Sequence, residues 1–116
     1  MARSCQMYGA LILLPLLSSP ASGFYYTYSE WEKLSDEYRM MYIAGAMDTL
    51  MIFAVGDEAA KVAIHYHNCL KNARMSNRQL ADNVQKHARA RPELRGGAVQ
   101  EALVSYVNEL CGLPEQ

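Results

Sequence analysis

The chain has few of the residue patterns that build catalytic centres. It contains three cysteines, one tryptophan, two phenylalanines and four prolines in 116 residues. No serine stands in a nucleophile motif, no glycine-rich phosphate loop is present, and the carboxylates show no pairing suited to acid-base catalysis. These absences argue against an enzyme.

An excess of charge of one sign is also missing, although the charges are unevenly placed. The chain carries 11 basic and 12 acidic residues, and no nucleic-acid-binding motif, so nucleic acid is a poor candidate partner. Residues 71–95 have a net charge of +5. Such a segment can steer an acidic partner, whereas the commoner cause is a solvated helix face docked near an acidic face of the same fold. We take Lys71, Arg74 and Arg78 as candidate partner-binding residues.

The N-terminus has no apolar run long enough to span a bilayer, but it has the layout of a secretory signal peptide. Arg3 precedes an apolar run at residues 7–17, and a small-residue stretch follows. A spanning helix needs about 20 apolar residues, whereas a leader of this layout is removed. We therefore expect a signal peptide at residues 1–23, cut after Ala21 or Gly23, and a periplasmic or secreted protein without a stable membrane anchor. An uncleaved anchor is the alternative.

The remaining residues 24–116 are enough for a single domain with a modest core. Removal of the leader takes away Cys5 and leaves Cys69 and Cys111, an even pair in an oxidising compartment. We predict that they form one disulfide, closing a loop of about 42 residues that the chain-entropy model values at roughly 4 kcal/mol. Two free buried thiols are the alternative.

No stretch of the chain is a convincing strand, and apolar residues recur at helical spacing instead. Capping boxes that begin at Ser29 and Ser76 predict two helix starts, and Pro92 disfavours a helical residue before it. The expected helices cover residues 29–53, 57–70, 76–91 and 99–111. The predicted fold class is all-α, a small bundle of about four short helices stapled by one disulfide.

Few side chains offer metal or buried-charge chemistry. On a helix only His65 and Cys69 share a face, and a disulfide would consume Cys69, so we expect neither a metal nor a cofactor. His87 lies among basic residues on a polar helix face and is expected to be exposed. Asp48 sits in an otherwise apolar helix, where it either ties a neighbouring amide to that helix or lies on an exposed face.

Half of the aromatic residues after the leader are gathered at residues 24–31. Tyrosine and tryptophan can anchor a protein interface. A lid over one end of a small bundle is the alternative that we favour.

The helix containing Asp48 carries a family motif. Tyr42-Ile43-Ala44-Gly45-Ala46-Met47-Asp48 resembles the Tyr-Val-x-Gly-x-x-Asp helix of the Rap/Tai-type immunity proteins, small exported helical proteins that protect bacteria against type VI secretion amidases. The second half agrees in order, with Cys69, a capped helix, Pro92 and an apolar helix ending in Cys111. The resemblance covers about residues 31–111, and on it we take Tyr42, Gly45 and Asp48 as structural residues.

The resemblance implies a periplasmic protein, often dimeric and without chemistry of its own, that blocks a peptidoglycan-cleaving amidase by placing a loop in its active-site cleft. It assigns no inhibitory residue, and the connection at residues 71–76 is the candidate. The chain lacks the second cysteine pair of typical members. The alternative is a periplasmic stress or acid-chaperone protein, or a structural protein of the same fold. A chaperone of this kind is expected to expose apolar surface.

Overall fold

The computed structural model describes residues 26–115, which form an all-α fold. The expected signal peptide lies outside these residues. The elements are α1 (Tyr28–Glu32), α2 (Asp36–Ile52), α3 (Asp57–Asn72), α4 (Asn77–Arg89), the 3-10 helix η2 (Pro92–Leu94) and α5 (Val99–Cys111). Within the described range the only β feature is an isolated bridge between Thr27 and Ala98. The predicted class, with four main helices, is confirmed.

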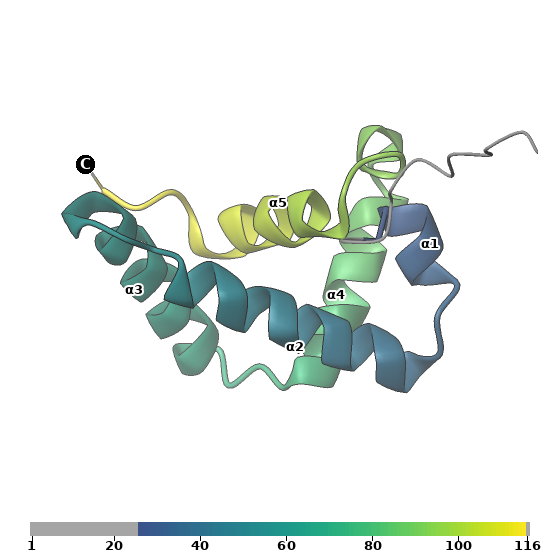
Figure 1. Ribbon diagram of the computed structural model, residues 1–116, viewed down its shortest axis with the longest axis horizontal. Helices are drawn as coiled ribbons and strands as arrows, with labels where there is room; N and C mark the ends of the chain where they lie inside the picture. Colours follow the sequence, from purple (N-terminus) through teal and green to yellow (C-terminus); the bar gives the residue numbers. More distant parts are fainter. Residues whose placement is uncertain (1–25, 116) are drawn as a thin grey trace, which may run out of the picture.

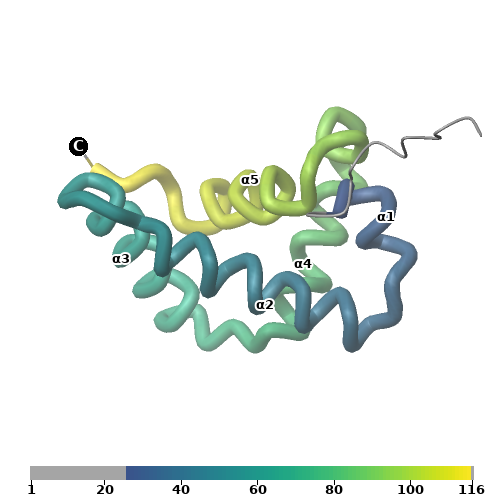
Figure 2. The backbone as a smooth tube through the Cα atoms, viewed as in Figure 1, coloured from purple at the N-terminus to yellow at the C-terminus, as the bar shows by residue number. Residues whose placement is uncertain are grey.

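α4 packs against both α2 and α5, and α1 lies at the same end of the molecule (Figure 1). α3 lies at the other end, beside the C-terminal segment (Figure 2). The chain returns from the end of α3 to the start of α4 through a short connection. This arrangement separates a region around α1 and α4 from a region around α3.

The hydrophobic core is built by four of the five α-helices. Its fully or nearly fully buried apolar residues are Tyr28, Trp31, Ile43, Leu80, Ala81, Val84, Ala88, Val99, Ala102, Leu103 and Val107. They come from α1, α2, α4 and α5, whereas α3 contributes no buried residue. The expected lid is thus partly a core element, because Tyr28 and Trp31 are completely enclosed.

The predicted first helix is wrong in its start and in its continuity. The capping box is formed by Thr27 and Glu30 rather than by Ser29, whose hydroxyl instead donates to the carbonyl of Arg95 at 2.8 Å. The chain then bends, and Ser35 caps α2. The bend brings the side chains of Trp31 and α2 to the same core, so tertiary burial overrides the uninterrupted helical pattern.

The later elements follow the sequence more closely. The capping box of Ser76 and Gln79 starts α4, and α5 has the predicted bounds. Gly56, with φ of 92°, is the N-cap of α3, a left-handed conformation that favours glycine. The 3-10 turn after Arg91 was not predicted.

The predicted disulfide between Cys69 and Cys111 is confirmed. It joins the C-terminal ends of α3 and α5, with the two Cα atoms 5.8 Å apart. Close by, the Tyr66 hydroxyl bonds to the Asn108 side chain.

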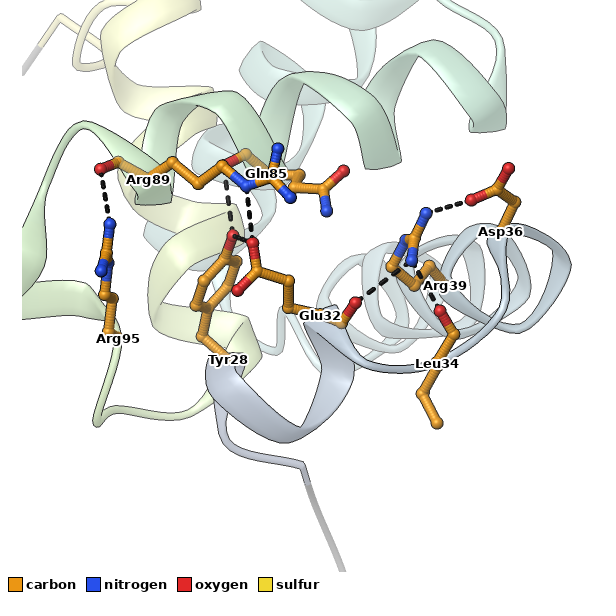
Figure 3. A network of polar contacts seen from close by, with 8 residues as sticks. All are labelled: Tyr28, Glu32, Leu34, Asp36, Arg39, Gln85, Arg89 and Arg95. Atoms are coloured by element: carbon orange, nitrogen blue, oxygen red, sulfur yellow. Dashed lines mark hydrogen bonds and ion pairs between the residues drawn. The ribbon is translucent and has the colours of Figure 1, made fainter.

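A polar network fastens α1 to α4 beside the core (Figure 3). The Tyr28 hydroxyl lies 3.1 Å from Glu32 Oε1 and 3.2 Å from the Gln85 carbonyl oxygen. Arg89 Nε donates to Glu32 at 2.6 Å. Burial, with the hydrogen bond and charge of Glu32, raises the pKa of Tyr28 to about 12. The hydroxyl therefore stays protonated at neutral pH.

Candidate partner-binding site

The three basic residues singled out from the sequence lie around the turn between α3 and α4. Lys71 belongs to the last turn of α3, Arg74 to the connection and Arg78 to the first turn of α4. All three side chains are exposed. The structure thus places them on one short, surface-exposed stretch of chain.

The backbone of this turn has the hydrogen bonds of a Schellman motif. The Arg74 amide donates to the Lys71 carbonyl at 3.0 Å, and the Met75 amide donates to the Leu70 carbonyl at 3.4 Å. Arg74 therefore occupies the position where glycine is usual, with φ of +50°. A residue with a Cβ pays about 1 kcal/mol or more for this left-handed conformation.

Ion pairing divides the basic segment into two parts. Arg89 pairs with Glu32, and Arg91 pairs with Glu109, so the C-terminal part neutralises acidic groups of the same fold. Within residues 26–115, Lys71, Arg74 and Arg78 form no ion pair. Docking against acidic groups of the same fold therefore explains Arg89 and Arg91. It does not explain Lys71, Arg74 and Arg78, which are available to a partner.

Asp48 lies on an exposed face of α2, and its carboxylate makes no hydrogen bond within the described part of the chain. Of the two expectations for Asp48, the structure thus agrees with the exposed side chain. Together with His67, Lys71 and Asn77 it lines a small cavity of about 190 Å³ between α2, α3 and the start of α4. We call the stretch that carries Lys71, Arg74 and Arg78 the basic turn. The carboxylate of Asp48 therefore lies at its edge.

Tyr42 connects three segments of the fold. Its hydroxyl accepts hydrogen bonds from the Tyr26 amide at 3.3 Å and from Gln100 Nε2 at 3.0 Å. The ring of Tyr26 packs edge-on against it, with ring centroids 5.3 Å apart. These contacts give Tyr42 a structural position between α2, α5 and the segment before α1.

Gly45, also taken as structural, is exposed in the middle of α2. Apart from its chain neighbours and the backbone of its own helix, no atom lies within 4 Å of the place where a Cβ would be. Since glycine in a helix interior costs about 1 kcal/mol relative to alanine, Gly45→Ala is expected to raise the free energy of unfolding by about that amount. Urea denaturation measures the change. A lower free energy of unfolding in the variant would contradict the open space beside Gly45.

The expectation that His87 is exposed is wrong. The side chain is buried between α4 and α5, with Nε2 2.8 Å from Ser105 Oγ and Nδ1 3.3 Å from Glu109 Oε2. Its position was readable from the spacing, because residue 87 follows Leu80 by seven and Val84 by three, on the apolar face of α4. On this helix the apolar spacing, and not the polarity of the side chain, indicates burial.

The contacts of His87 connect Ser105, His87 and Glu109 in the order of a serine-hydrolase triad. The Tyr106 ring packs against the imidazole, with ring centroids 5.7 Å apart. Neither Ser105 nor His87 lines any of the four main cavities within residues 26–115. The contacts of His87 with Ser105 and Glu109 join α4 to α5.

Burial and the neighbouring charge of Arg91 lower the pKa of His87, against the opposing effect of Glu109 and Glu93. The unfolded chain then binds the proton at a higher pH than the folded chain does. The contribution of neutral His87 to the free energy of unfolding is expected to be complete above pH 6.5. It is expected to be lost as the pH decreases through the folded pKa. Urea denaturation between pH 7.5 and about 5 measures it. His87→Gln should flatten this dependence, whereas the exposed His67→Gln should not.

An apolar groove of about 520 Å³ lies between α2, α3 and α5. We call it the apolar groove, and its lining includes Leu50, Phe53, Val62, Tyr66, Leu103 and Val104. Ile52, Phe53 and Val55 at the adjoining corner are each at least 74% exposed. Exposed apolar surface of this extent marks an interaction site in many soluble proteins. Sequence reasoning missed the groove, because it depends on how α3 is oriented.

Residues 26–115 hold no cluster of metal-ligating side chains. Histidine, cysteine and carboxylate side chains in this range do not cluster in threes around a common point that could hold a metal. His65 lies 2.9 Å from the Gly112 carbonyl oxygen. None of the helices in the described part combines the length and apolar character needed to cross a bilayer.

Comparison with known proteins agrees with the motif in α2. Neither the curated proteins nor the solved structures give a match. A family model described as Rap1a immunity proteins matches residues 2–110, which is most of the chain. The resemblance noted in the sequence is thereby confirmed, and this protein belongs to the Rap1a immunity protein family.

Proposed function

We propose that this protein is a periplasmic immunity protein that binds a peptidoglycan amidase and blocks its active-site cleft by occlusion. Family membership indicates an immunity protein that binds a secreted effector protein. The leader-like residues 1–23 support export, and the peptidoglycan layer is where such an amidase would act. The protein itself supplies no chemistry in this proposal, because inhibition requires only that the cleft be covered.

The observation that carries the proposal is the exposed arginine in a position that favours glycine. The left-handed turn holds Arg74 at a cost in stability, and such strain is typical of functional sites. A guanidinium group can bind a carboxylate with two hydrogen bonds, and arginine is enriched among residues that dominate interface energies. Lys71 and Arg78 add positive charge on both sides. We therefore propose that this turn contacts an acidic surface of the effector.

The direct test is capture of the partner. The oxidised protein without residues 1–23 is immobilised and exposed to periplasmic extract of its own host. One stoichiometric partner is expected, with peptidoglycan-hydrolase activity that added immunity protein suppresses. Capture of a partner without that activity would overturn the amidase proposal and leave the effector class open.

We also propose that two copies associate through the corner formed by Ile52, Phe53 and Val55. These exposed side chains lie beside the apolar groove, so a projection and a recess share one face, as a two-fold interface requires. Phe53→Asp is therefore expected to convert a dimer into a monomer, measured by light scattering after gel filtration. Tyr38→Asp is the matched control, because Tyr38 is a similarly exposed aromatic residue on α2, at 67%. A dimer that survives Phe53→Asp would contradict this interface.

A periplasmic chaperone is the second candidate, and the exposed apolar groove is the observation that favours it. A chaperone would suppress aggregation of many chemically unfolded proteins, whereas an immunity protein would bind one folded enzyme. Aggregation assays at neutral and acid pH separate the two. Suppression that Phe53→Asp abolishes, without any stoichiometric partner, would favour the chaperone.

A further inference from the structure

α3 is a long helix that contributes no buried residue to the hydrophobic core. Its 16 residues include none that is buried, whereas the other four α-helices supply every residue of the core. Only partly buried side chains, Tyr66 and Leu70, pack from α3 against that core. Most helical stability in proteins comes from packing of an apolar face. Apolar packing against the core therefore contributes little to holding α3 in place.

The attachments of α3 to α5 lie in its C-terminal half. They are the disulfide of Cys69, the contact between His65 Nε2 and the Gly112 carbonyl oxygen at 2.9 Å, and the hydrogen bond between Tyr66 and Asn108. The N-terminal half begins at Gly56, which provides no side-chain cap, and Ile64 is well exposed. The covalent bond is thus the strongest of a small set of contacts.

Two surfaces depend on where α3 lies. The basic turn starts two residues after Cys69, since Lys71 and Leu70 accept the hydrogen bonds that shape it. Val62 and Tyr66 form one wall of the apolar groove, opposite residues of α2 and α5. Displacement of α3 would alter the turn and open the groove together.

We propose that the Cys69–Cys111 disulfide is a redox-sensitive tether, whose reduction releases α3 and the Arg74 turn while the core stays folded. A dithiol reductant supplies the two electrons. One of its thiolates attacks a cystine sulfur, giving a mixed disulfide and one free cysteine thiolate, and its second thiol then resolves the mixed disulfide. The products are two cysteine thiols and the oxidised reductant. The cystine residues are only half-buried and adjoin exposed Asn68 and Gly112, so a reductant can approach.

The consequence for effector binding rests on the proposed function, but the tether itself does not. Amide hydrogen exchange on the whole mature chain, oxidised and then treated with dithiothreitol, measures it directly. In the reduced protein, protection of α3 amides is expected to fall by about 100-fold or more, while α4 and α5 keep clear protection, as separately opening units do. The fluorescence of Trp31 should stay native-like.

Three variants support the experiment. Cys69→Ser with Cys111→Ser should reproduce the reduced pattern, and the same pair in a Gly45→Ala background keeps the test valid if the first variant is too unstable to fold. Tyr66→Phe removes a hydrogen bond but retains the disulfide, and α3 should stay protected in it. The proposal is overturned if reduction leaves α3 protected, or if all helices lose protection together. Neither result involves an effector, so this failure is distinct from failure of the proposed function.

Discussion

Trp31→Ala is expected to lower the free energy of unfolding by about 3–5 kcal/mol, the range measured when a large aromatic side chain is removed from a core. Trp31 is completely buried, and its ring centroid lies 5.7 Å from that of Tyr28. Its indole Nε1 also donates to the Arg39 carbonyl at 3.2 Å, which joins α1 to α2. The variant would lose both the apolar contacts and this hydrogen bond.

Thermal unfolding followed by circular dichroism measures this loss, since the chain has one tryptophan and the variant therefore has no tryptophan fluorescence to follow. For a domain of this size, each kcal/mol shifts the midpoint by about 4–8 °C. Tyr38→Ala is the matched control, because its exposed ring should change stability by only about 0.5 kcal/mol. A loss below about 1 kcal/mol for Trp31→Ala would contradict the buried position of α1.

The same residue shows why the start of the fold could not be predicted from the sequence. Two overlapping capping boxes, beginning at Thr27 and at Ser29, are both compatible with a helix at this position. The choice between them depends on which one brings Tyr28 and Trp31 into a core whose other residues, apart from Ile43, lie more than 40 positions later. Local patterns carry no information on that contact.

The second half of the chain was more predictable because its signals are local. A complete capping box fixes the start of α4, an apolar repeat fixes α5, and an even pair of cysteines predicts the disulfide. His87 is the exception: its spacing places it on the apolar face of α4, but the partners of its ring nitrogens, Ser105 and Glu109, come from α5. A polar side chain on an apolar stripe needs a partner that only the tertiary structure identifies.

For the candidate site, the sequence predicted the residues but not their conformation. Uneven charge identified Lys71, Arg74 and Arg78. The left-handed turn was not predictable, because glycine is the usual signal for that backbone conformation and this position carries arginine. The disagreement between residue type and backbone is itself the structural argument for a functional role at Arg74.

Charge reversal of that turn, Arg74→Glu with Arg78→Glu, is expected to weaken effector binding by about 100-fold or more, since it replaces charge-assisted contacts by repulsion. Lys33→Glu with Lys61→Glu is the matched control, since it also reverses two exposed cations, one before α2 and one near the start of α3. Isothermal titration with the captured effector gives the affinities. Equal losses in the reversal variant and in the control would show that overall charge, rather than the turn, governs binding.

Arg74→Gly separates binding from stability at the same position. Glycine adopts φ of +50° without the cost that arginine incurs, so this variant is expected to gain about 1 kcal/mol in unfolding free energy. It should nevertheless bind the effector more weakly, because the guanidinium group is gone. Opposite signs of the two changes would show that Arg74 is retained for its contact rather than for the fold. A variant that is more stable and binds equally well would exclude the Arg74 side chain from the interface, and would leave Arg78 to account for any effect of charge reversal.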